Sequence, residues 1–457
     1  NTETLGSDKL TLRLDWNINE NHKLSFRNNY VKADFFGIGR STSTNIQFDN
    51  GGQSFESTSN TASLELNSTF GNNLANNFIL GYTRVRDDRN TVGDPFPRIE
   101  INDGDARIFA GSEPFSTANR LDQDIITLTN NFEIYSGRHT ITLGTHNEYS
   151  DITNVFFGRN FGEYTYSTLQ GFFDNDANEY RSSYSVLGGV GDDSVGAAEF
   201  ELFQLGFYAQ DEVQLSDNFK FSMGLRFDFP IWDDGRGNTD FNTRGVNLLE
   251  AAGKDLQGAR VGQGPETKAH ISPRLGFNWD VKGDRKTQLR GGLGVFTSRM
   301  PLVWPGGAYN NTGNNVANTR IFRPREGDDR PNTVPVFNPD VNTQLREDNP
   351  FQGNIDLLAE DLRLPQVFKA SFAIDQRLPA GFTISAEILS NTTITGLNVE
   401  NVNLAGQQFT TTGAGSRANF GGELVDETYG GIFLVSNTGQ GKRSEERRVG
   451  KECRSRW

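Results

Sequence analysis

Two long stretches between Glu199 and Phe229 place apolar side chains on every second position. The residues between them are polar or small, and the apolar positions are Phe203, Leu205, Phe207, Ala209, Val213, Leu215, Phe219, Phe221, Met223, Leu225, Phe227 and Phe229. A period of two is that of a β-strand with one apolar and one polar face. Each alternation lasts about ten residues or more, the length that a tilted strand needs to cross a bilayer. The pattern therefore predicts membrane-spanning strands.

Composition restricts how such a chain can cross a membrane. Only 35% of the 457 residues are hydrophobic and the mean hydropathy is −0.57. No stretch approaches the roughly 18 apolar residues that a membrane helix needs. A β-barrel tolerates this polarity because its lumen and its loops are polar. The 35 phenylalanines, against two methionines, also suit strands and membrane interfaces.

The same hairpin pattern recurs along the chain with short turns. Five further hairpins are predicted around turns at residues 19–22, 71–73, 136–137, 283–284 and 379–381. Additional strands are predicted at 397–404 and 432–435. The connections between hairpins are long and rich in Gly, Asn, Asp, Ser and Pro, at residues 31–59, 84–119, 150–197, 233–271 and 297–364. Short turns at one rim and long loops at the other are typical of outer-membrane barrels. The predicted fold is all-β, a transmembrane antiparallel up-and-down β-barrel.

Residues 443–457, RSEERRVGKECRSRW, differ abruptly from the rest of the chain. They resemble the translation of a widely used sequencing adapter, which predicts that residues 443–457 are a tail not native to the protein. The alternative is a basic, solvated tail. Without the tail the chain has no cysteine, and its net charge changes from −14 to −17, because the tail carries six basic and three acidic residues. This charge argues against nucleic acid as a partner.

Several motifs carry a family resemblance. Two of them resemble the paired strands of TonB-dependent outer-membrane receptors: FYAQDEVQLSDNFKFSMGLRFDFP (207–230) and ISPRLGFNWDVKGDRKTQLRGGLGVF (271–296). Five others resemble the Oar-like branch of that family: RDDRNTVGDPFPRI (86–99), SEPFSTANRLDQDIITLTNNF (112–132), SGRHTITLGTHNEY (136–149), NFGEYTY (160–166) and LRLPQVFKASFAIDQRLPAGF (362–382). The resemblance covers most of residues 1–442.

This resemblance implies a 22-stranded barrel in the outer membrane of a Gram-negative cell. Residues 1–442 would be a partial barrel of about 12–14 strands, with a plug domain and a TonB box expected upstream of Asn1. The implied partners are outer-membrane lipid, the plug of the same protein and, through that part, the TonB energy-transducing complex. The implied function is uptake of a scarce, unidentified ligand. A passive porin or a surface adhesion barrel is the alternative. A secreted soluble β-protein would expose a large apolar band to water.

No catalytic constellation is visible, and we expect neither an enzyme nor a cofactor. The histidines His22, His139, His146 and His270 show no metal-ligand spacing. Asp174, Asp176 and Asn178 match the opening of a calcium loop, but Glu179 and Ser185 do not fit its later positions, which favours a solvated acidic loop.

Two groups of residues are candidates for functional contacts. Polar parity predicts that one group faces the lumen, where its members would contact the plug, line the ligand path or pair with each other: Glu212, Arg226, Asp228, Arg274, Asp280 and Arg290. The other group consists of aromatic residues in the long loops, which would contact ligand or lie at the membrane interface: Phe156, Phe157, Tyr164, Tyr166, Trp304 and Tyr309.

Overall fold

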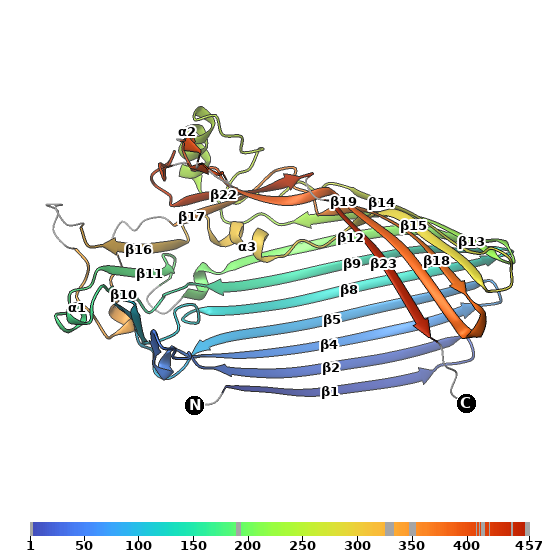
Figure 1. The fold of residues 1–457 in the computed structure, drawn as a ribbon, viewed down its shortest axis with the longest axis horizontal. Helices are drawn as coiled ribbons and strands as arrows, with labels where there is room; N and C mark the ends of the chain where they lie inside the picture. The colour runs from blue at the N-terminus through green and yellow to red at the C-terminus, as the bar shows by residue number, and fades with distance from the viewer. Residues whose placement is uncertain are drawn as a thin grey trace.

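A curved antiparallel sheet forms most of the computed structural model (Figure 1). The structure describes residues 3–188, 193–324, 333–346, 353–407, 409–410, 412, 416–419, 421–439 and 442–452. Twelve strands follow one another in chain order across the sheet: β1 (Thr4–Asn17), β2 (His22–Gly37), β4 (Gln53–Phe70), β5 (Leu74–Thr91), β8 (Asn119–Ser136), β9 (His139–Phe156), β12 (Ala198–Ser216), β13 (Phe219–Trp232), β14 (His270–Asp280), β15 (Thr287–Thr297), β18 (Gln366–Arg377) and β19 (Phe382–Asn401). They are the six predicted hairpins, which the pairing confirms.

The last strands share the pairing edge of β19. Its C-terminal part pairs with β22 (Gly431–Thr438), which pairs in parallel with β17 (Asn354–Leu358). Its N-terminal part pairs with β23 (Lys442–Glu452). β22 confirms the strand predicted to start at 432–435. The separate strand predicted at 397–404 is wrong, because residues 397–401 continue β19 and residues 402–404 lie beyond its end. That residues 443–457 are non-native stays a prediction.

Several strands extend further than predicted. β2 runs to Gly37 and β4 starts at Gln53, so the first connection is much shorter than residues 31–59. These extensions include polar pairs such as Asp34↔Glu56 and Lys32↔Thr58 as well as the aromatic pair Phe35↔Phe55. The backbone ladder continues there because its hydrogen bonds do not require an apolar face.

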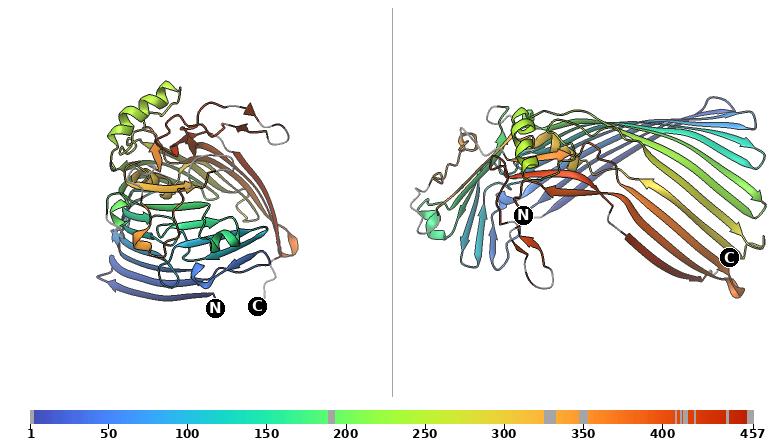
Figure 2. Two further views of the ribbon diagram at one scale, coloured as in Figure 1. Left: turned by 90° about the vertical axis from the view of Figure 1, so that its left-hand side faces the viewer. Right: turned by 90° about the horizontal axis from the view of Figure 1, so that it is seen from above.

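The two faces of the sheet differ in chemistry, as the alternation predicts. One face exposes apolar side chains, among them Leu12, Leu14, Leu143, Phe207, Leu275, Leu293 and Phe372. The other carries charged and small residues and faces the lumen. Viewed along the strands, the sheet is an arc, and its edges do not pair with each other among the described residues (Figure 2). No helix in the described part of the chain is long and apolar enough to span a membrane.

The described parts of the long connections form a folded layer at one end of the arc (Figures 1 and 2). Six of its strands form a second sheet in the order β16 (Val316–Phe322), β11 (Glu179–Ser185), β10 (Glu163–Tyr166), β6 (Arg98–Asp103), β7 (Ala106–Ala110) and β3 (Asn45–Gln47). We call this end, with the helices described next, the loop layer. Because β10 pairs in parallel with β6, and β3 with β7, the layer joins segments far apart in sequence.

A second part of the loop layer packs on the lumen face of the main sheet. It contains α2 (Val246–Ala251), α3 (Val303–Asn310), β17 and β22, whose core includes Phe200, Leu202 and Trp232 from β12 and β13. The ring of Tyr309 in α3 stacks on that of Phe200 with 4.8 Å between centroids. The remaining short elements are α1 (Leu169–Phe173), β20 (Phe409–Thr410), β21 (Ala418–Asn419), the 3-10 turns η1 (Asp49–Gly51), η2 (Asp193–Gly196), η4 (Val341–Thr343) and η5 (Pro379–Gly381), and the π-helical turn η3 (Phe241–Gly245).

Candidate functional site: the lumen wall and the loop layer

Four of the six predicted lumen-facing residues form ion pairs. Arg226 Nη2 lies 2.7 Å from Asp228 Oδ1, and Arg290 Nε lies 3.0 Å from Asp375 Oδ2. Glu212 contacts Lys220 on the neighbouring strand. Arg226 and Asp228 thus pair with each other, whereas Arg290 and Glu212 pair with residues outside the predicted group. Their contact with a plug or a ligand stays a prediction.

Asp280 and Arg274 differ from this pattern. Asp280 Oδ2 accepts a hydrogen bond from the backbone N–H of Arg285 at 2.8 Å, so it closes the turn between β14 and β15. Arg274 forms no ion pair with the described residues. Its guanidinium carbon lies 4.6 Å from the ring centroid of Phe296, and Lys369 Nζ lies 5.3 Å from the same centroid.

A hollow of about 400 Å³ adjoins these two cations. Its lumen-side lining comes from Arg274, Gly292, Phe296, Lys369, Ser371, Leu389 and Asn391. Gly294 is the cross-strand neighbour of both Arg274 and Lys369. Gly294 adds no side chain in the row of the two cations, and both cations lie against the ring of Phe296.

A smaller hollow of about 270 Å³ lies on the lumen wall beside Arg226. Tyr208 lines it, with its hydroxyl hydrogen-bonded to Asn131 and Arg226 5.4 Å from its ring centroid. Gly144 is the cross-strand partner of Tyr208. A Cβ at Gly144 would lie 2.2 Å from Cε2 of that ring, so the position requires glycine for Tyr208 to lie as it does.

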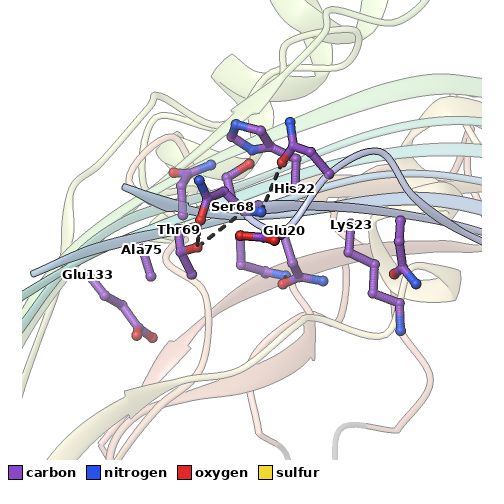
Figure 3. Close-up of a pocket in the computed structure, with 13 residues that line it drawn as sticks. Glu20, His22, Lys23, Ser68, Thr69, Ala75 and Glu133 are labelled. Atoms are coloured by element: carbon purple, nitrogen blue, oxygen red, sulfur yellow. Dashed lines mark hydrogen bonds between the residues drawn. The ribbon is translucent and has the colours of Figure 1, made fainter. Parts of the chain in front are cut away.

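A hollow of about 660 Å³ lies at the opposite end of the strands from the loop layer, beside the β1–β2 turn (Figure 3). Its lining is mostly polar, and Figure 3 shows Glu20, His22, Lys23, Thr69 and Glu133 around it. The amide of Asn77 donates to Glu65 Oε1 and Asn67 Oδ1, both at 2.9 Å. These bonds tie the polar wall together at the rim that carries the short turns.

Four of the six loop aromatics predicted to contact ligand are buried. Phe157, Tyr164 and Tyr166 are at most 1% exposed and Tyr309 is 5% exposed. They fill the cores of the loop layer, so direct ligand contact is corrected to a packing role for these four side chains. Alternation and residue type could not separate the two roles, because both use aromatic rings in loops. Phe156 and Trp304 are more than 40% exposed, and their role stays a prediction.

Burial shifts the pKa values of several ionisable groups in the loop layer. Burial raises the pKa of Tyr166 to about 12 and also raises that of Tyr180. It raises the pKa of Asp356 despite a 2.8 Å hydrogen bond donated by Asn311 Nδ2. Burial also acts to raise the pKa of Glu179, but hydrogen bonds from Arg181 and Arg320 outweigh it, and that pKa is lowered. The layer is thus a packed structure with few free charges in its core. Among the described residues no group of three or more His, Cys, Asp or Glu side chains could hold a metal ion.

Some residues of the lumen wall were not predicted from the sequence. Lys369 has the polar parity of β18, opposite to Phe368 and Phe372, so alternation could have identified it. The contact of Arg299 with Glu148 could not be foreseen, because it joins a loop after β15 to the lumen face of β9.

Comparisons with known proteins agree with this architecture. A family model described as an outer membrane beta barrel domain matches residues 1–442. No curated protein matches the chain. The outer membrane transporter YddB from Escherichia coli is similar with a TM-score of 0.57 and 11% identity, over 96% of this chain and 44% of YddB. A mutant of the ferric enterobactin receptor PfeA from Pseudomonas aeruginosa has a TM-score of 0.51 and 12% identity, over 98% of this chain and 49% of PfeA. The chain thus spans less than half the length of these two proteins, and at such identities the likeness concerns the fold.

Proposed function

The chain belongs to the outer membrane beta barrel domain family of the Gram-negative outer membrane, and from this premise we propose that it is part of a TonB-dependent receptor-like barrel for uptake of a scarce ligand. In this proposal the loop layer and a plug capture the ligand. Energy from the TonB complex then moves the plug and releases the ligand inward. The plug and the TonB box would belong to parts of the protein outside this sequence.

The observation that carries the proposal is the open arc of the main sheet. β1 pairs only with β2 among the described residues, and neither β22 nor β23, which pair along β19 at the other end of the sheet, pairs with β1. A sheet in lipid must close, because unpaired backbone groups in hydrocarbon cost several kcal/mol each. The twelve consecutive strands already exceed the number in a small barrel filled by side chains, so a closed barrel built from them has a wide lumen, which a plug can occupy.

A passive porin or a surface adhesion barrel is the second candidate. The folded loop layer favours it, since a second sheet at the outer rim offers a rigid surface for a partner. This candidate needs neither a plug nor coupling to TonB.

Two measurements on the full-length protein separate the candidates. The first is conductance in planar bilayers, and the second is binding of the purified periplasmic domain of TonB from the same bacterium. A plugged, energised receptor should show no steady open channel and should bind TonB. A steady conductance without TonB binding would refute energised uptake and favour the porin.

A further inference from the structure

We propose that Arg274 and Lys369 form an oxyanion site on the lumen wall, which takes a carboxylate into the hollow beside Phe296. The inference deepens the proposed function, on which it rests, by assigning a ligand chemistry to one place in the lumen. The carboxylate could come from a free ligand or from an acidic side chain of the plug, and the experiment below distinguishes these sources.

The first step of the argument is charge balance. Arg226, Arg290 and Lys220 on neighbouring strands each have a carboxylate partner. Arg274 and Lys369 have none within the described ranges, and both lie against the ring of Phe296. Two like charges beside one ring repel each other more strongly in a partly desolvated wall than in bulk water. An anion between them would remove that repulsion.

The second step is orientation. Arg274, Phe296 and Lys369 lie on strands whose opposite face carries exposed Leu275, Leu293 and Phe372. Side chains of successive residues in a strand point to opposite faces. The two cations therefore face the lumen, where a solute or the plug can reach them.

The third step is space. Gly224 and Gly294 are the cross-strand neighbours of Arg274 on its two sides. In the next row towards the short turns, Gly276 pairs with Gly292, and Gly292 pairs with Ser371. These small residues leave the hollow of about 400 Å³ beside the cations, and the Ser371 hydroxyl and Asn391 amide add hydrogen-bonding groups to its wall. A small carboxylate fits this volume and this chemistry.

The test uses the purified full-length protein with citrate as the probe, titrated by calorimetry at constant ionic strength. The variants are R274Q, K369Q, R274Q/K369Q and the conservative R274K. K282Q is the matched control, because Lys282 is exposed in the β14–β15 turn and its loss removes the same charge far from the hollow. Heat-modifiable migration on gels checks that each variant folds. If the double variant does not fold, R274K still allows the test.

For a free ligand we expect wild type to bind citrate, each glutamine variant to weaken binding at least tenfold, and the double variant to lose it. K282Q should bind as wild type, R274K should retain part of the affinity, and added salt should weaken binding. For a plug carboxylate we expect no citrate binding, but faster hydrogen exchange of the plug in R274Q/K369Q than in K282Q. If neither effect is observed in protein that still migrates as folded, the proposed site is refuted. TonB binding and bilayer conductance are measured on the same samples, so failure of energised uptake is seen separately.

Discussion

Arg226 holds the carboxylate of Asp228, two residues along the same strand, through hydrogen bonds from Nε at 2.9 Å and Nη2 at 2.7 Å to Oδ1. Asp228 is 2% exposed, so its charge depends on this partner. The pair lies at the outer end of β13, where Asp228 pairs in register with His270 of β14. It thus fixes a charged side chain at the boundary between the lumen wall and the loop layer.

Replacement of Asp228 by asparagine should leave Arg226 without its anion. We expect D228N to lower the free energy of unfolding by about 2 kcal/mol, below the 3–5 kcal/mol of fully buried pairs because Arg226 keeps contact with water. Urea unfolding of the full-length protein in detergent, followed by tryptophan fluorescence, measures this. D284N, which removes an exposed partner of Lys286, should cost less than 1 kcal/mol. Equal costs for the two variants would contradict a special role of the Arg226–Asp228 pair.

A methyl group at Gly144 should displace the ring of Tyr208. We expect G144A to cost about 1–3 kcal/mol, as overpacking does, and to break the contact of Tyr208 with Asn131. G224A is the control, since its nearest contact would be an ordinary 3.4 Å. In a double-mutant cycle of unfolding free energies, Y208A should remove most of the cost of G144A. Additive costs would show that the two residues do not interact.

The alternation of side chains was enough to predict the hairpins, because it follows directly from strand geometry. For β12 and β13 the predicted outward parity matches the exposed Phe203, Phe207, Met223 and Leu225. The loop layer could not be predicted in this way. Its core joins Tyr164 of β10 to Tyr180 of β11 and to Phe337, with centroids 4.9 and 5.1 Å apart. Such contacts depend on pairing between distant segments, which local periodicity does not encode.

For the candidate lumen residues, too, the sequence predicted one property and not another. The alternation of side chains predicted that Arg274 and Arg290 lie on the polar face. Their contacts with Phe296 and Asp375 agree with this prediction. The alternation could not tell which cation would have a carboxylate across the strand. That depends on register, which put Lys220 opposite Gln214 and close to Glu212. Sequence therefore predicted the face but not the pairing.

The partly buried carboxyl of Asp356 should make the loop layer sensitive to pH. Burial raises its pKa in the folded protein above the unfolded value of about 3.9, so folding favours the protonated form. Its burial therefore costs stability at neutral pH, and the cost disappears as pH falls through the raised pKa. We expect D356N to raise the thermal unfolding midpoint at pH 7.5 and to have no effect near pH 3.5. Calorimetry of both proteins at the two pH values tests this, with the exposed D361N as control. A gain that is the same at both pH values would refute the explanation.

Adjacent residues of β12 provide a direct test of which face meets lipid. Ala209 shares the parity of the exposed Phe207, whereas Gln210 is on the lumen side, where its amide donates to Glu212 Oε1 at 3.3 Å. An arginine in the middle of the lipid face of a barrel costs about 2–4 kcal/mol. We therefore expect A209R to lower the unfolding free energy in liposomes by that amount. Q210R should be close to neutral, because its guanidinium would meet lumen water and the carboxylate of Glu212. Unfolding of the full-length protein from liposomes in guanidinium chloride measures both variants. A larger cost for Q210R than for A209R would reverse the assignment of the two faces and, with it, the lumen position of Arg274 and Lys369.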